Sequence, residues 1–151
     1  MSSHPAVPDQ LVVRLRVTEI LEEFYARCDR GDSVADLLDE NAQFVTPHRN
    51  AQGRDAFAAL LLSLAKNRRE QGGAGRHFGT NINIEDLGSG QFRVRSLMLF
   101  IAMDGGPGTK GFMNLGDHDD IVAFDARGNC RFVKRAMTPV AQFALSPLGD
   151  K

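Results

Sequence analysis

The stretch Arg76-His77-Phe78-Gly79-Thr80-Asn81-Ile82-Asn83-Ile84-Glu85 begins the part of the chain in which apolar residues alternate as they do in β-strands. Strict alternation divides it into two faces. The polar face is formed by His77, Gly79, Asn81 and Asn83, and the apolar face by Phe78, Ile82 and Ile84. If the apolar face packs against helices, His77 faces away from them. A bulge at Gly79 would switch the faces, whereas without one the polar face would line a wet cavity. The alternation leaves both arrangements open.

Before this stretch, apolar positions recur at helical spacing. A helix is expected over residues 10–29, with an apolar side formed by Val13, Val17, Ile20, Leu21, Phe24 and Cys28. Gly31 ends this helix, and Asp32 or Ser33 can cap a short second helix that runs through residue 38. A short strand at residues 42–46, a loop at 47–52 and a third helix at about 53–69 follow.

After it, strand periodicity predicts four long strands, at residues 76–86, 91–103, 111–124 and 130–137. Helices followed by antiparallel strands indicate an α+β fold, with three N-terminal helices packed on one face of a strongly curved, mainly antiparallel sheet. The whole chain, 1–151, is expected to be a single domain. Residues 1–9 are interpreted as a loose arm, 104–111 as a flexible glycine-rich connection and 138–151 as a C-terminal tail.

Composition excludes several classes of partner. The formal net charge is -1, which argues against nucleic acid or an anionic membrane as the main partner. No apolar run approaches the length of a membrane span, and the first residues lack the pattern of a signal peptide. Cys28 and Cys130 form no CxxC pair and are expected to be free thiols. We therefore expect a cytoplasmic protein whose partner is a small molecule.

The order of elements, with the segment His77-Phe-Gly-Thr-Asn81 opening the first long strand, resembles the SnoaL-like group of the nuclear transport factor 2-like superfamily. Within it, the chain is most similar to the branch of hexachlorocyclohexane dehydrochlorinase and scytalone dehydratase. The resemblance implies a cone-shaped half-barrel with a deep apolar pocket. It also implies that Asp29, in Tyr25-Ala-Arg-Cys-Asp29, and His77 abstract a proton, and that Arg135, in Phe132-Val-Lys-Arg135, stabilises an anion.

The chain departs from both of these enzymes. Phe24 stands in the region where the dehydrochlorinases carry a pocket lysine, and Leu99-Phe100-Ile101 stands where scytalone dehydratase has a second pocket histidine. Tyr25 is the only tyrosine, whereas scytalone dehydratase uses two. Neither reaction is therefore carried over as such, and the His77–Asp29 pair is what remains.

That pair is also chemically plausible without the family. A carboxylate bound to one imidazole nitrogen fixes the tautomer and leaves the other nitrogen basic. In the alternative interpretation Asp29 caps a turn, His77 is a core histidine and Arg135 is a surface residue of a strand in which alternate residues face water.

Other residues are candidates for contact with a substrate. Gly116-Asp117-His118-Asp119-Asp120 resembles a hard-metal cluster, but successive strand residues point to opposite faces, so no metal site is expected and a single residue, His118, reaches the pocket. His48 follows Pro47 in a loop expected at the pocket mouth. The aromatic residues either form the core or line a slot for a cyclic substrate; those proposed as contacts are Phe24, Tyr25, Phe44, Phe57 and Phe100.

The sequence thus predicts an acid–base enzyme without a cofactor, of dehydratase, dehydrohalogenase or isomerase type, acting on a small apolar cyclic molecule. The alternative is a non-catalytic ligand-binding or assembly subunit similar to the β subunits of aromatic-ring dioxygenases. Residues 97–103 are apolar on both faces, which predicts a strand covered on both sides and, with it, a homodimer or homotrimer.

Overall fold

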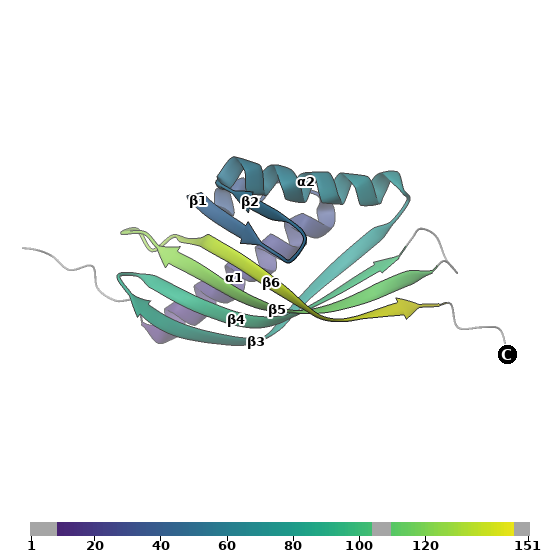
Figure 1. Ribbon diagram of the computed structural model, residues 1–151. Helices are drawn as coiled ribbons and strands as arrows, with labels where there is room; N and C mark the ends of the chain where they lie inside the picture. The colour runs from purple at the N-terminus through teal and green to yellow at the C-terminus, as the bar shows by residue number, and fades with distance from the viewer. Residues whose placement is uncertain (1–8, 104–109, 147–151) are drawn as a thin grey trace, which may run out of the picture.

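Two α-helices and a six-stranded sheet make up residues 9–103 and 110–146, which the computed structural model describes (Figure 1). Most of the expected arm, most of the glycine-rich connection and the end of the expected tail (1–8, 104–109 and 147–151) lie outside the described residues. The α+β class predicted from the order of the elements is confirmed.

The helices begin and end at residues with clear roles. Helix α1 (Gln10–Arg30) starts where the Asp9 carboxylate accepts a hydrogen bond from the Leu11 amide at 2.9 Å. It ends at Gly31, whose left-handed φ of 75° suits glycine. Helix α2 spans Arg54–Glu70. The expected short second helix is only a 3₁₀ turn, η1 (Ala35–Leu37), because the chain enters a strand at the next residue. The prediction of three helices is therefore wrong for the described residues, which hold two α-helices.

The sheet has the strand order β2-β1-β6-β5-β4-β3. Its strands are β1 (Leu38–Val45), β2 (Asn50–Gln52), β3 (Ala74–Gly88), β4 (Gln91–Met103), β5 (Gly111–Phe124) and β6 (Cys130–Leu145). All neighbouring pairs are antiparallel except β1 and β6, which are parallel. The sheet is therefore mainly antiparallel, as predicted.

Two boundaries differ from the sequence-based expectation. The loop expected at 47–52 contains β2, which pairs with the end of β1. The prediction of a C-terminal tail from residue 138 is wrong for residues 138–145. There β6 continues along β5, with Phe143 opposite Met113. Backbone pairing with a long neighbouring strand extended β6 beyond the point where its alternation fades.

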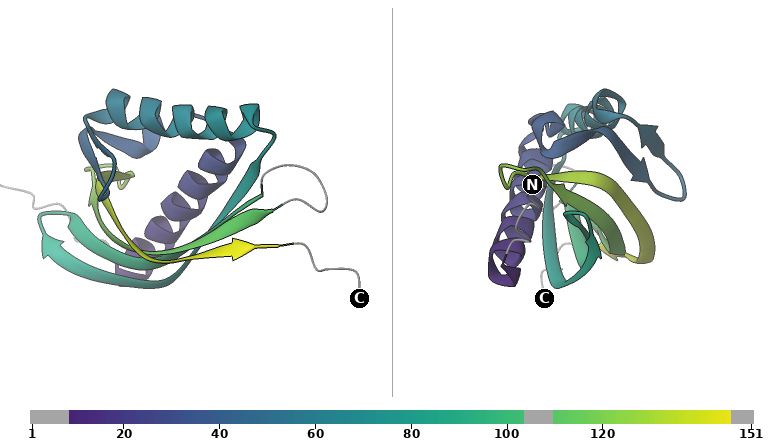
Figure 2. Two further views of the ribbon diagram at one scale, coloured as in Figure 1. Left: turned by 45° about the vertical axis from the view of Figure 1, so that its right-hand side comes forward. Right: turned by 90° about the vertical axis from the view of Figure 1, so that its left-hand side faces the viewer.

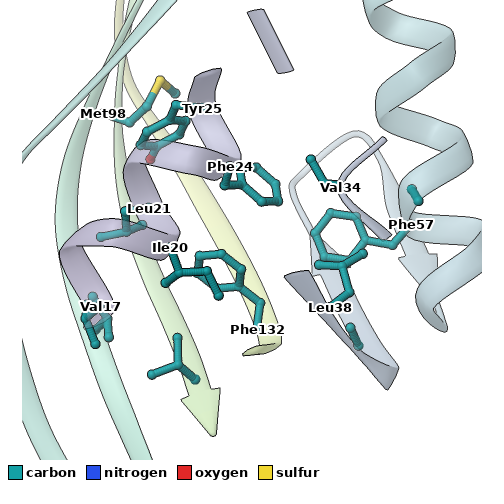
Figure 3. Close-up of a cluster of buried hydrophobic side chains, with 14 of the residues drawn as sticks. Val17, Ile20, Leu21, Phe24, Tyr25, Val34, Leu38, Phe57, Met98 and Phe132 are labelled. Carbon is teal, nitrogen blue, oxygen red and sulfur yellow. The ribbon is translucent and has the colours of Figure 1, made fainter. Parts of the chain in front are cut away.

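The sheet bends strongly, and α2 crosses above its concave side (Figure 2). Helix α1 packs on β3, and α2 packs on β1. The hydrophobic core lies between the two helices and the sheet (Figure 3). In it the Phe24 ring of α1 meets Phe132 of β6 and Phe57 of α2, with centroids 5.3 and 6.2 Å apart. The apolar side predicted for α1 is buried except Cys28, which is partly buried.

A bulge in β3 determines which face His77 presents. Thr80 pairs with Leu97 but Asn83 pairs with Arg95, so β3 carries one extra residue between them. Asn81, in this interval, has a φ of 54°. His77 therefore lies on the inner face with Ile82 and Ile84, while Phe78 is 52% exposed. The face does switch, but the bulge lies at Asn81 rather than at Gly79.

The outer face of β4 is apolar and half-buried at Leu97, Leu99 and Ile101. The homodimer or homotrimer expected from this strand stays a prediction. Within the described residues, neither helix is long and apolar enough to cross a membrane.

Candidate functional site

A cavity of about 560 Å³ opens between the helices and the sheet. This volume suits a small cyclic molecule. Of the seven proposed contact residues, those that line it are Phe24, Tyr25, Phe44, His48, Phe100 and His118. Phe57 does not line it, because its fully buried ring packs against Phe44 at 5.0 Å and against Phe24. His48 is exposed, in the loop between β1 and β2.

His77 and Asp29 meet at one wall of this cavity. Nδ1 of His77 lies 2.6 Å from Oδ1 of Asp29, and the His77 backbone amide donates to Oδ2 of the same carboxylate at 3.1 Å. Their side chains are only 19% and 11% exposed. Asp29 occupies the last turn of α1, and the bulge in β3 brings His77 to it. Because a carboxylate only accepts, the Nδ1 proton belongs in this hydrogen bond, and Nε2 is left as the basic nitrogen.

Two aromatic rings hold the imidazole of His77. The Tyr25 ring stacks on it, with centroids 5.4 Å apart and an interplanar angle of 7°. The Phe100 ring, opposite His77 in the β3–β4 register, lies 4.3 Å away. The imidazole is therefore fixed both by a hydrogen bond and by packing, which is the preorganisation that proton transfer requires.

Arg135 lies fully buried beside the hydroxyl of Tyr25. It forms an ion pair with Asp120, Nη2 to Oδ2, at 2.9 Å, and Nη2 also donates to the Tyr25 hydroxyl at 3.1 Å. Its guanidinium carbon stands 4.3 Å from the centre of the Phe24 ring. A second register shift, where Ile121 pairs with Lys134 and Val122 with Phe132, turns Arg135 inward. The alternative interpretation of Arg135 as a surface residue is therefore wrong.

One donor of Arg135 has no partner. Nη1 is buried, and no described residue accepts a hydrogen bond from it. Arg135 lines the cavity. A buried donor without a partner costs free energy.

His118 completes a second polar group beside Arg135. Its Nδ1 is 3.3 Å from both Oδ1 of Asp120 and Nη2 of Arg135, so it donates to the first or accepts from the second according to its tautomer. Burial, followed by the charge of Arg135, lowers the pKa of His118. Burial raises the pKa of Asp120, but Arg135 and His118 outweigh it, so the pKa of Asp120 is low. At neutral pH the imidazole of His118 is therefore neutral and lies beside the ion pair of Arg135 and Asp120.

Sequence reasoning missed the role of Asp120 and the cavity positions of Arg68 and Cys28. Asp120 follows His118 by two residues in a strand, and this spacing indicates a shared face. Asp119, in the same predicted cluster, points the other way and pairs with Arg93. No sequence signal indicated Arg68, because it looks like one of several basic residues closing a helix.

Solved structures share this fold. A candidate scytalone dehydratase from Novosphingobium aromaticivorans matches with a TM-score of 0.75 and 21% identity, over 93% of this chain and 96% of that one. A hexachlorocyclohexane dehydrochlorinase, LinA type 2, matches with a TM-score of 0.75 and 14% identity, over 94% and 95%. ActVI-ORFA from Streptomyces coelicolor matches with a TM-score of 0.73 and 17% identity, over 84% and 97%. No family model and no curated protein matches the sequence.

Proposed function

Since the chain has the fold of the SnoaL-like group of the nuclear transport factor 2-like superfamily, we propose that it is an acid–base enzyme of lyase or isomerase type that works without a cofactor. Its substrate would be a small, largely apolar cyclic molecule. The observation that carries the proposal is the 2.6 Å contact between Nδ1 of His77 and Oδ1 of Asp29 at the wall of a cavity.

In this proposal His77 is the general base. Nε2 removes a proton from carbon while Asp29, held through Nδ1, stabilises the imidazolium that forms. General base catalysis of this kind contributes roughly 10²–10⁴-fold to the rate. Asp29 is itself fixed by two hydrogen bonds from His77, so little reorganisation accompanies the transfer.

Arg135 would stabilise the charge that proton removal creates. Its unpartnered Nη1 would donate to an enolate oxygen or a leaving group; because this nitrogen is buried, neighbouring side chains would have to move to admit that oxygen. Asp120 already neutralises much of the guanidinium charge, so we assign Arg135 the role of a hydrogen-bond donor more than that of a free cation. A donor so placed in a dry site is worth about 3 kcal/mol of transition-state stabilisation.

The lining favours a cyclic substrate. Aromatic rings from α1, β1 and β4 line the same cavity as His77. They belong to Phe24, Tyr25, Phe44 and Phe100. Removal of a proton next to a carbonyl gives an enolate. This intermediate either expels a group from the next carbon, which is elimination, or takes the proton back at another carbon, which is isomerisation.

The test uses two simple probes. With 3-hydroxycyclohexanone, elimination releases water and gives cyclohexenone, which is followed by its ultraviolet absorbance. With cyclohexanone in D₂O, proton abstraction alone appears as deuterium at the α carbon by NMR. We expect the wild-type protein to catalyse at least the exchange, and His77→Ala to abolish it while retaining the circular dichroism spectrum of the fold.

His48→Ala is the matched control, because His48 also lines the cavity but has no carboxylate partner among the described residues. Because His48 is a proposed contact, its loss can weaken ketone binding, but the variant should retain the exchange rate at saturating ketone. If His77→Ala exchanged cyclohexanone as fast as the wild type, the base assignment would fail. A wild-type protein that binds both ketones but exchanges neither would instead support the alternative, a ligand-binding or assembly subunit.

A further inference from the structure

The charged side chains that line the cavity are all basic. Among the described residues that line it, arginine occurs at Arg49, Arg68 and Arg135, whereas aspartate and glutamate do not occur. Asp29 and Asp120 do not line it, and they are engaged with His77 and with Arg135. The charge that the lining itself presents to a ligand is therefore positive, which favours a ligand that brings negative charge.

Arg68 is the partly buried cation of this lining that forms no ion pair among the described residues. Arg135 pairs with Asp120, and Arg49 is exposed in the loop after β1. Arg68 is partly buried, and no described carboxylate lies within ion-pairing distance of its guanidinium. Burial lowers the pKa of Arg68, opposed by the charge of Asp29. A partly desolvated guanidinium of this kind gains from a carboxylate more than an exposed one does.

Packing relates Arg68 to the proposed base. Its guanidinium carbon lies 4.5 Å from the centre of the Phe100 ring, and the same ring lies 4.3 Å from the His77 imidazole. Arg68 of α2 and His77 of β3 therefore both contact the Phe100 ring, and both line the cavity. A ring compound in this cavity can present an acidic substituent to Arg68 and a carbon to Nε2 of His77.

We propose that the ligand of this cavity is a ring compound carrying a carboxylate, and that Arg68 binds this carboxylate. The inference deepens the proposed function, which names only an apolar cyclic molecule. The planar guanidinium presents two parallel N–H donors to the two carboxylate oxygens, which fixes orientation as well as affinity. Arg68 is a binding residue in this assignment and takes no part in proton transfer.

The test is titration calorimetry with matched probes of one shape, benzoate and benzamide. Wild-type protein should bind benzoate more tightly than benzamide. Arg68→Gln should weaken benzoate binding by about 10- to 100-fold and change benzamide binding little. Arg68→Lys, which retains the charge, should lose less. Arg69→Gln is the control, because Arg69 is the exposed neighbour on α2 and does not line the cavity.

The outcomes separate this inference from the proposed function. Equal binding of benzoate and benzamide by the wild type, or equal weakening by Arg68→Gln and Arg69→Gln, would overturn the carboxylate assignment and leave the assignment of His77 untouched. His77→Ala should lose ketone exchange yet retain the preference for benzoate that depends on Arg68. If it retained exchange and that preference, the base assignment would fail and the Arg68 assignment would stand.

Discussion

The hydroxyl of Tyr25 accepts a hydrogen bond from Nη2 of Arg135 at 3.1 Å, while its ring stacks on the imidazole of His77. Tyr25 therefore contacts both polar groups of the cavity, the His77–Asp29 pair through its ring and the Arg135–Asp120 pair through its hydroxyl. A change in the position of Tyr25 is expected to affect both groups.

Replacing Asp29 should change the tautomer of His77. In the wild type, the carboxylate holds the proton on Nδ1 of the neutral imidazole. We expect Asp29→Ala to remove this preference and to slow cyclohexanone exchange by roughly 10²-fold. The tautomer is measured by ¹⁵N NMR of the imidazole ring, with exposed His48 as the internal reference. An unchanged His77 spectrum in Asp29→Ala would contradict the contact.

The ion pair of Arg135 and Asp120 should show strong coupling in a double-mutant cycle. Arg135→Met leaves the fully buried Asp120 carboxylate without its cation and with only the His118 imidazole beside it, at a cost of about 3–5 kcal/mol in the free energy of unfolding. The double variant with Asp120→Leu should recover much of that loss, because no charge is then left unpaired. Urea unfolding measures all four proteins. Additive losses would show that the two side chains do not interact.

Mild acid should destabilise the fold through His118. Burial and Arg135 lower its pKa in the folded protein, whereas the unfolded chain titrates near the ordinary value of about 6.5. The unfolded state therefore binds more protons below about pH 6.5, and stability falls as pH falls, by up to about 1.4 kcal/mol per pH unit. Asp120, with a low pKa, adds a further loss only below about pH 4. His118→Gln should flatten the unfolding profile between pH 7 and 5 relative to the wild type, as measured by urea unfolding at each pH.

Asn81 should be sensitive to the shape of its replacement. Its φ of 54° lies in the left-handed region, which asparagine tolerates and β-branched residues do not. We expect Asn81→Val to cost about 1–2 kcal/mol in thermal or urea unfolding. Asn81→Gly should be as stable as the wild type or more so. If valine were accepted without loss, the bulge would not depend on this conformation.

Gly79 should tolerate no side chain. A Cβ at this position would lie 2.8 Å from Cε2 of Tyr25, so the ring that stacks on His77 would have to move. Gly79→Ala is expected to cost about 1–3 kcal/mol and to reduce ketone exchange along with stability. Thr80→Ala, a neighbouring change on the same strand, serves as the control for unfolding. Full activity in Gly79→Ala would show that the position of Tyr25 is not critical.

The sequence by itself determined the two α-helices and the four long strands, although not the full length of β6, because periodicity is a local property. The apolar spacing of α1 and α2 and the alternation of β3 to β6 predicted the α+β class, and Asp29 could be placed at the border of a buried helix face. His118 could be placed in the pocket for the same reason. Helix ends were also readable, since Gly31 is needed where φ is positive.

Only the tertiary structure decided which faces these residues present. Bulges beside Asn81 and Lys134 each shift a strand by one residue, and they turn His77 toward Asp29 and Arg135 toward Asp120. The position of a bulge depends on how a strand pairs with its neighbour and on how the whole sheet bends. The local alternation of apolar residues therefore does not predict it. The same holds for Arg68, which becomes a cavity residue only because α2 lies across the concave side of the sheet and its guanidinium reaches Phe100 of β4.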